Sequence, residues 1–104
     1  MTSPSDILRT KLNLETAQLQ WSELERHFAR GSVIKVAIGT DLIDAALHIA
    51  ENNAATVQGW LADATIARAE MSDAEDWHAR QPHFWVVVVA PWVLVQEVVK
   101  QLEP

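Results

Sequence analysis

The amino-acid sequence predicts a single α+β domain over residues 1–104. The first observation is the apolar run over residues 83–95, which holds four consecutive valines flanked by aromatic residues. β-Branched and aromatic side chains lose rotamer freedom in helices and pack well in sheets, so this run predicts a central strand. The second observation is a series of amphipathic segments that begin with helix-capping signals. We therefore expect a small sheet centred on residues 84–90 and covered by about five short helices, with a mixed strand order as an open alternative.

The first third of the chain predicts two helices. Ser3 can cap free amides and Pro4 suits the first helical position, and the leucine spacing extends this helix over residues 4–18. Residues 22–25, Ser-Glu-Leu-Glu, form a capping box that predicts a second helix, and Gly31 is placed to end it. The buried stripe expected for this second helix consists of Trp21, Leu24 and Phe28.

A strand and a third helix follow. Apolar residues alternate over residues 32–38, and Lys35 indicates that one face of this strand is partly wet. Asp41 comes after a Gly-Thr turn and is placed to cap the next helix. One side of that helix is apolar, and the opposite side, which we expect to be exposed, carries Asp44, His48, Glu51 and Asn52.

The second half of the chain predicts shorter elements around the central strand. Asn53 suits the start of a short helix, a short strand is expected over residues 65–69, and residues 72–75 form a second capping box. Pro91 marks an edge, a bulge or the end of the central strand, and the chain is expected to be extended up to about Gln96, with a helical turn afterwards. Side chains expected to point inward from the two helices are Val57, Trp60, Leu61 and Trp77.

Composition excludes several classes of function. The absence of cysteine excludes disulfides and thiolate metal sites and favours a reducing, cytoplasmic environment. Eight basic and fourteen acidic residues give a net charge of −6, which disfavours nucleic acid and anionic membranes as partners. The N-terminus lacks the layout of a signal peptide, and the apolar run is too short to span a bilayer as a helix, which takes about 20 residues.

A polar group at the start of the third helix is the candidate ligand site. Asp41, Asp44 and His48 gather just after a strand, where ligand sites often lie in sheets with helical crossovers. Capping by Asp41 and an exposed surface for the other two explain the same pattern. The four histidines form no ligand framework, so we expect neither a metal nor a cofactor, and no catalytic signature is present.

Two tryptophans predict an interface. Trp21, Trp60 and Trp77 lie on expected buried stripes, whereas Trp85 and Trp92 belong to a sheet that a small domain can cover only in part. Exposed tryptophan is typical of protein interfaces, so we expect a homodimer with Trp85 or Trp92 at the contact. The alternative is that the first two helices cover this face and complete a monomer.

Several stretches resemble a small bacterial family known as a domain of unknown function (number 2288). The resemblance implies a stand-alone bacterial protein and brings no catalytic residue, cofactor or substrate. The stretches that carry it are Leu12-Asn-Leu-Glu-Thr-Ala17, Trp21-Ser-Glu-Leu24, Val36-Ala-Ile-Gly-Thr-Asp-Leu-Ile43, Trp60-Leu61 and Ala90-Pro-Trp-Val-Leu-Val-Gln-Glu97.

These observations lead to two hypotheses from different classes. The first is a non-catalytic protein-interaction module that self-associates. The alternative is a small-ligand-binding protein or enzyme that uses the polar site at Asp41, Asp44 and His48. A flat apolar patch would favour the first hypothesis, and a closed cleft with convergent polar groups would favour the second.

Overall fold

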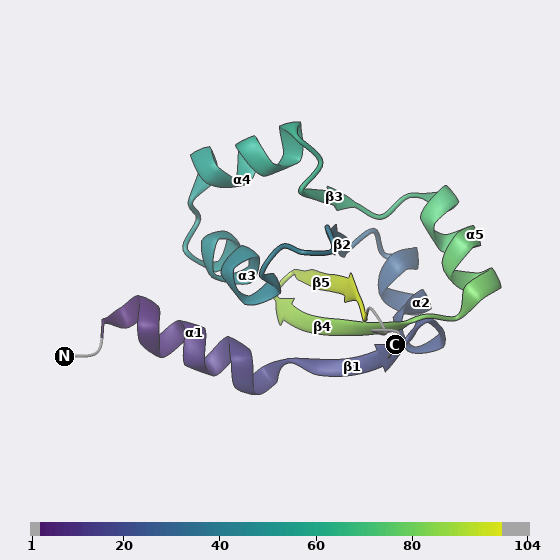
Figure 1. Cartoon of the computed structure of the whole chain (residues 1–104), viewed down its shortest axis with the longest axis horizontal. Helices are drawn as coiled ribbons and strands as arrows, with labels where there is room; N and C mark the ends of the chain where they lie inside the picture. The colour runs from purple at the N-terminus through teal and green to yellow at the C-terminus, as the bar shows by residue number, and fades with distance from the viewer. Residues whose placement is uncertain (1–2, 99–104) are drawn as a thin grey trace, which may run out of the picture.

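The computed structural model describes residues 3–98, which form five helices and a five-stranded sheet (Figure 1). This architecture confirms the predicted α+β class. In chain order the elements are α1 (Pro4–Glu15), β1 (Ala17–Gln20), α2 (Trp21–Ala29), β2 (Val33–Val36), α3 (Leu42–Ala50), α4 (Ala54–Ala62), β3 (Ile66–Arg68), α5 (Met71–Arg80), β4 (His83–Val89) and β5 (Trp92–Glu97).

The sheet is mixed, with the strand order β1-β4-β5-β2-β3. β4 and β5 form an antiparallel hairpin that turns at Ala90 and Pro91, where the peptide bond is cis. β2 lies parallel to β5, whereas β1 and β3 pair antiparallel to their neighbours at the two edges. The extended conformation expected up to Gln96 is confirmed by β5, and the helical turn expected afterwards falls largely outside the described residues.

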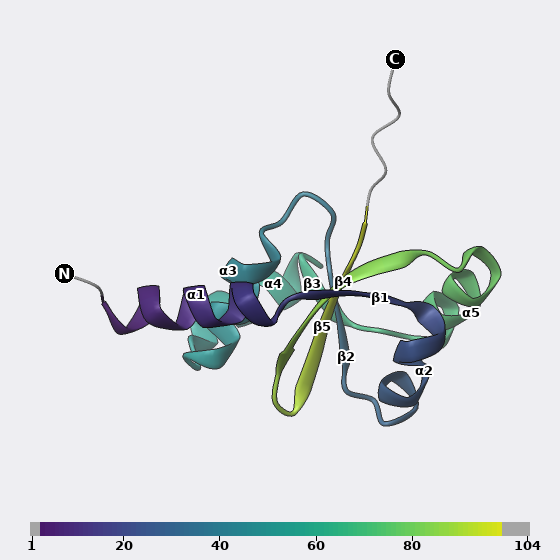
Figure 2. The same cartoon turned by 90° about the horizontal axis from the view of Figure 1, so that it is seen from below.

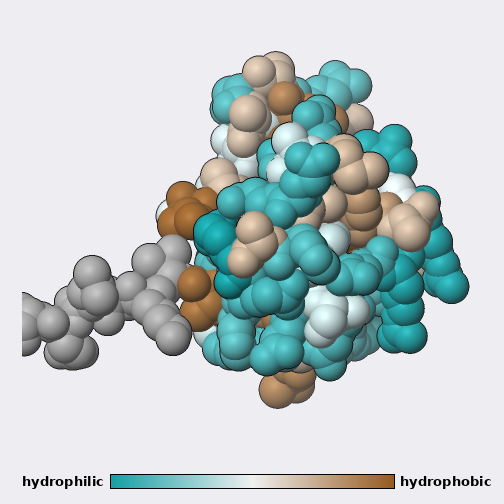
Figure 3. Space-filling view, turned by 90° about the vertical axis from the view of Figure 1, so that its right-hand side faces the viewer, coloured by the Kyte–Doolittle hydropathy of each residue, from teal (hydrophilic) through white to brown (hydrophobic). Residues whose placement is uncertain are grey.

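Helices cover both faces of this sheet (Figures 1 and 2). One face carries α1, α3 and α4, and the other carries α2 and α5. Side chains of β4 belong to two separate cores, one on each face of the sheet. Val87 packs with Leu12 and the apolar side of α3, whereas Phe84 packs with Trp21 and Trp77. The two-sided burial expected for the valine-rich strand is therefore confirmed at Val86 and Val87, whereas Val88 is 54% exposed. From the side of α2 and α5, hydrophilic residues cover most of the surface, and hydrophobic ones form smaller separate areas (Figure 3).

The first helix is shorter than the predicted range of residues 4–18. α1 ends at Glu15, Thr16 is its C-cap, and residues 17–20 form β1 against β4. Leu12 of α1 is buried against the sheet, but Leu14 is exposed, and Leu19 packs on the core at the opposite face of the sheet. The leucine spacing continued beyond the helix because the chain crosses from one face to the other at this point.

Both capping boxes lie two residues earlier than the sequence motif suggested. α2 begins at Trp21, and the Glu23 carboxylate accepts a hydrogen bond from the Gln20 backbone N–H at 3.0 Å. α5 begins at Met71, and Asp73 accepts from the Glu70 N–H at 2.8 Å. A carboxylate at the third helical position can reach back whatever the preceding side chain is, so the serine was not required.

α4 departs most from the expected packing. No residue of this helix is buried, Val57 and Trp60 are only half-buried, and Leu61 is 49% exposed. The side chains of α4 stay partly exposed because this helix packs against α3 and the short edge strand β3 and does not cross the centre of the sheet. The inward placement predicted for Leu61 is therefore wrong.

Candidate functional site

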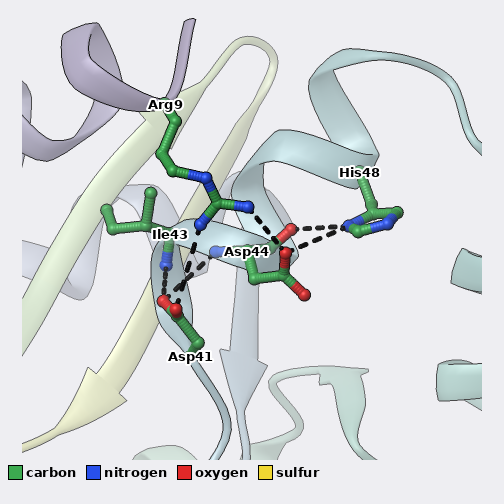
Figure 4. Close-up of polar contacts among 5 residues, drawn as sticks. All are labelled: Arg9, Asp41, Ile43, Asp44 and His48. Atoms are coloured by element: carbon green, nitrogen blue, oxygen red, sulfur yellow. Dashed lines mark hydrogen bonds and ion pairs between the residues drawn. The ribbon is translucent and has the colours of Figure 1, made fainter. Parts of the chain in front are cut away.

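The structure brings the predicted polar residues together at the start of α3 (Figure 4). Asp41 is the N-cap, and its Oδ1 accepts hydrogen bonds from the backbone N–H groups of Ile43 at 3.0 Å and Asp44 at 3.2 Å. Gly39 precedes it with a φ of +95°, a conformation that glycine adopts at low cost and that turns the chain from β2 into α3. The expected capping by Asp41 is confirmed.

Arg9 completes this group, and no local sequence pattern indicated it. Arg9 lies on α1, and its Nη2 donates to Asp44 Oδ1 at 2.9 Å while Nη1 lies 3.9 Å from Asp41 Oδ2 (Figure 4). The guanidinium thus links α1 to the first turn of α3. Only the packing of α1 against α3 brings these residues, more than thirty positions apart, into contact.

His48 is not on a wet face, which corrects the expectation from the helical pattern. Its side chain is 26% exposed, and its ring lies edge-on to the Trp60 ring with the centroids 5.1 Å apart. Nδ1 lies 2.9 Å from the backbone oxygen of Asp44. A carbonyl oxygen can only accept, so Nδ1 carries the proton in this contact. α4 packs along one side of α3 and covers His48 there. The periodicity of residues within α3 cannot predict this contact, because it depends on a different helix.

These contacts give each polar group a structural partner. Asp41 caps a helix, Asp44 binds Arg9, and His48 binds the turn before it and packs on Trp60. A general base or a ligand-binding carboxylate must direct its polar atoms at a substrate position. The arrangement here joins α1, α3 and α4 to one another.

The two tryptophans proposed for an interface have different surroundings. Trp85 on β4 is 40% exposed, and its neighbours across the sheet are Gln18 of β1 and Gln96 of β5. Trp92 on β5 is half-buried against the core beside α3 and α4, and the Arg68 guanidinium carbon lies 5.4 Å from its ring centroid. Of the two, Trp85 is the ring available at the surface.

A cavity of about 310 Å³, lined by both polar and apolar residues, lies beside the ends of the parallel strands β2 and β5. Lys35 donates to both carboxylate oxygens of Asp73, at 2.8 and 2.9 Å, and the floor is formed by Trp77, Phe84 and Val95. Lys35 is half-buried, so the partly wet strand face predicted from its position is confirmed. Its ammonium group is already neutralised by Asp73.

Residues 3–98 contain neither a cluster of metal ligands nor a membrane-spanning helix. No group of three or more histidine, aspartate or glutamate side chains in this part of the chain is arranged to hold a metal ion. Within the same residues, no helix has the length and apolar character that a bilayer crossing requires.

Fold and surface together define the class: a small protein with a mixed five-stranded sheet, helices on both faces, and a polar cluster committed to structural contacts. The chain belongs to the family described as Protein of unknown function (DUF2288), whose model matches residues 7–97. It is similar to the NMR solution structure of PA1075 from Pseudomonas aeruginosa, with 36% identity and a TM-score of 0.80, covering 100% of this chain and 96% of the other. No curated protein matches the chain.

Proposed function

We propose that the protein is a non-catalytic interaction module that self-associates through the β1 edge of its sheet. The observation that carries this proposal is an open strand edge beside an exposed tryptophan. β1 ends the sheet on one side, three of its four residues are exposed, and Trp85 lies on the neighbouring strand opposite Gln18. An exposed edge presents backbone N–H and C=O groups that can pair with another strand.

A second copy of this chain fits the edge. An antiparallel strand can pair with its own twofold copy, and such a contact uses the same residues on both subunits. Two five-stranded sheets would then join into one. A stable interface buries roughly 800 Å² per partner, more than four residues of backbone supply. Leu14, 82% exposed near the end of α1, and Trp85, 40% exposed on β4, are large apolar side chains available to add to this area.

Other surfaces are less suited to this contact. β3, the strand at the opposite edge, has only three residues and carries Arg68, and a cationic residue on an edge strand discourages pairing. The side formed by α2 and α5 is mostly hydrophilic (Figure 3). The β1 edge has no lysine or proline within the strand to block a partner.

The alternative, a ligand or catalytic site at Asp41, Asp44 and His48, is supported less well. Arg9 pairs with Asp44, and Asp41 is occupied by two backbone amides. The net charge of −6 also disfavours nucleic acid and anionic membranes as partners. A bacterial, cytoplasmic setting is part of this proposal, supported by the similarity to the Pseudomonas aeruginosa protein and by the absence of cysteine.

Sedimentation equilibrium tests the proposal directly. The expected result at tens of micromolar is a mass of twice the 11.6 kDa chain. Gln18→Lys places a positive charge on the edge strand of each copy and should weaken dimerisation at least about tenfold, which corresponds to about 1.4 kcal/mol.

Gln58→Lys on α4 is the matched control, because it makes the same change at another exposed glutamine and should leave the dimer intact. A wild-type mass near 11.6 kDa would refute self-association. A dimer that Gln18→Lys leaves unchanged would place the contact elsewhere.

A further inference from the structure

An unfilled space lies between α4 and the sheet. α4 contains apolar residues but buries none of them, and a cavity of about 200 Å³ lies between this helix and the strands β2, β3 and β5. Its lining is apolar apart from one residue, Arg68. A second hollow of about 260 Å³ continues past Val57 and Trp92, which line both spaces. We call the first space the α4 cavity.

The lining defines the body of a ligand. Ile34 and Ile66 from the sheet, Ile49 from α3, and Val57 and Leu61 from α4 surround the α4 cavity, with the Trp92 ring at one side. Engineered apolar cavities of about 150 Å³ hold a benzene molecule, so this volume suits one aromatic ring or a short branched chain. The α4 cavity is partly open to solvent, and drug-sized ligands, which need roughly 300–1,000 Å³, exceed the volume of this space alone.

Arg68 defines the charge of the ligand. Its Nη2 donates to the backbone oxygen of Gly31 at 2.7 Å, and its guanidinium lies over the Trp92 ring. Within residues 3–98, Arg68 forms no ion pair with a carboxylate, in contrast to Arg9 and Arg80. A guanidinium has five N–H donors, and the contact with Gly31 uses one of them. The remaining donors are in the planar arrangement that binds a carboxylate through two bonds.

We propose that the α4 cavity binds a small monocarboxylate with an aromatic or branched aliphatic body. The apolar body would occupy the space between α4 and the sheet, and the carboxylate would pair with Arg68 at the rim. Filling this space would bury Leu61, which is now 49% exposed, and would hold α4 against the sheet. This site is separate from the β1 edge, which lies at the other end of the strand order.

Titration of the ¹⁵N-labelled protein followed by NMR tests the site. The probes are 4-methylbenzoate and its neutral analogue of similar shape, 4-methylbenzyl alcohol. The shifts should concentrate at the Trp92 indole N–H and at the backbone amides of Ile49, Val57 and Leu61. The carboxylate should bind at least about fivefold more tightly than the alcohol, because a charge-assisted pair with Arg68 forms only with the carboxylate.

Arg68→Gln should abolish the difference between the two probes while leaving the alcohol bound. Arg26→Gln is the matched control, because it removes an exposed arginine from α2 on the opposite face and should preserve the difference. If Arg68→Gln fails to fold, 4-methylbenzylamine with the wild-type protein serves instead and should bind more weakly than the alcohol. Equal binding of carboxylate and alcohol, or shifts away from α4, would refute the proposal.

Discussion

Asp41 shows how much one side chain contributes to the start of a helix. Its carboxylate accepts two backbone N–H groups of α3 that would otherwise have no intrahelical partner. Asp41→Ala should therefore lower the free energy of unfolding by about 1 kcal/mol, the usual cost of removing an N-cap. Asp41→Asn should retain most of this stability, since asparagine caps equally well. Urea denaturation measures both, and an unchanged midpoint for Asp41→Ala would contradict the capping assignment.

His48 is the residue whose expected effect the structure changes most. An exposed histidine would tolerate alanine, but His48 packs on Trp60 and binds the backbone oxygen of Asp44. His48→Ala should lower the free energy of unfolding by about 1 kcal/mol, because an aromatic contact and a hydrogen bond are lost together.

His78 is the control for His48, since its side chain is 76% exposed and His78→Ala should be nearly neutral. Thermal unfolding of the two variants provides the comparison. Equal effects would mean that the Trp60 contact contributes nothing.

Between elements, Arg80 joins α5 to the end of β5. It binds both carboxylate oxygens of Asp76, at 2.9 and 2.6 Å, and Glu97 at 2.9 Å. The hydrogen bonds from Arg80 hold the pKa of Asp76 below its ordinary value of 3.8. A carboxyl group with a lower pKa in the folded state stabilises the fold above its unfolded pKa, and this contribution is lost as the pH falls through the folded pKa.

Asp76→Asn should consequently reduce the loss of stability at low pH. The wild-type melting temperature is expected to fall as the pH drops below about 4, and the variant should fall less over the same interval, because it has no carboxylate to protonate there. Thermal unfolding followed by circular dichroism from pH 7 to pH 2 measures this. If the two curves of melting temperature against pH superimpose after normalisation at pH 7, the contact between Asp76 and Arg80 does not contribute to the loss of stability in acid.

For the whole molecule, stability arises from two apolar cores on the two faces of one sheet. Phe84, Val87, Leu94 and Val95 are completely buried, and the buried residues of both cores are apolar. Folding should therefore be independent of metal. EDTA is expected to leave the melting temperature unchanged, whereas a decrease of 4 °C or more, equivalent to roughly 0.5–1 kcal/mol, would contradict this. Metal analysis of the purified protein is the independent check.

The sequence by itself determined the class of fold and most element positions. The valines of β4 could be assigned to a two-sided strand because their periodicity is local, and Asp41 could be assigned as a cap because capping involves only neighbouring residues. Gly31, with a φ of +73°, ends α2 for a similarly local reason. Each of these features depends on bonds within a few residues of the chain.

Only the tertiary structure decided the features that depend on distant segments. The end of α1 at Glu15 follows from the pairing of β1 with β4, the surroundings of His48 follow from α4, and the partner of Asp44 is Arg9 on another helix. The α4 cavity likewise exists because α3, α4 and three strands meet around Trp92. A residue pattern records which side chains prefer burial, but the contacts that satisfy them are set by how the elements pack in space.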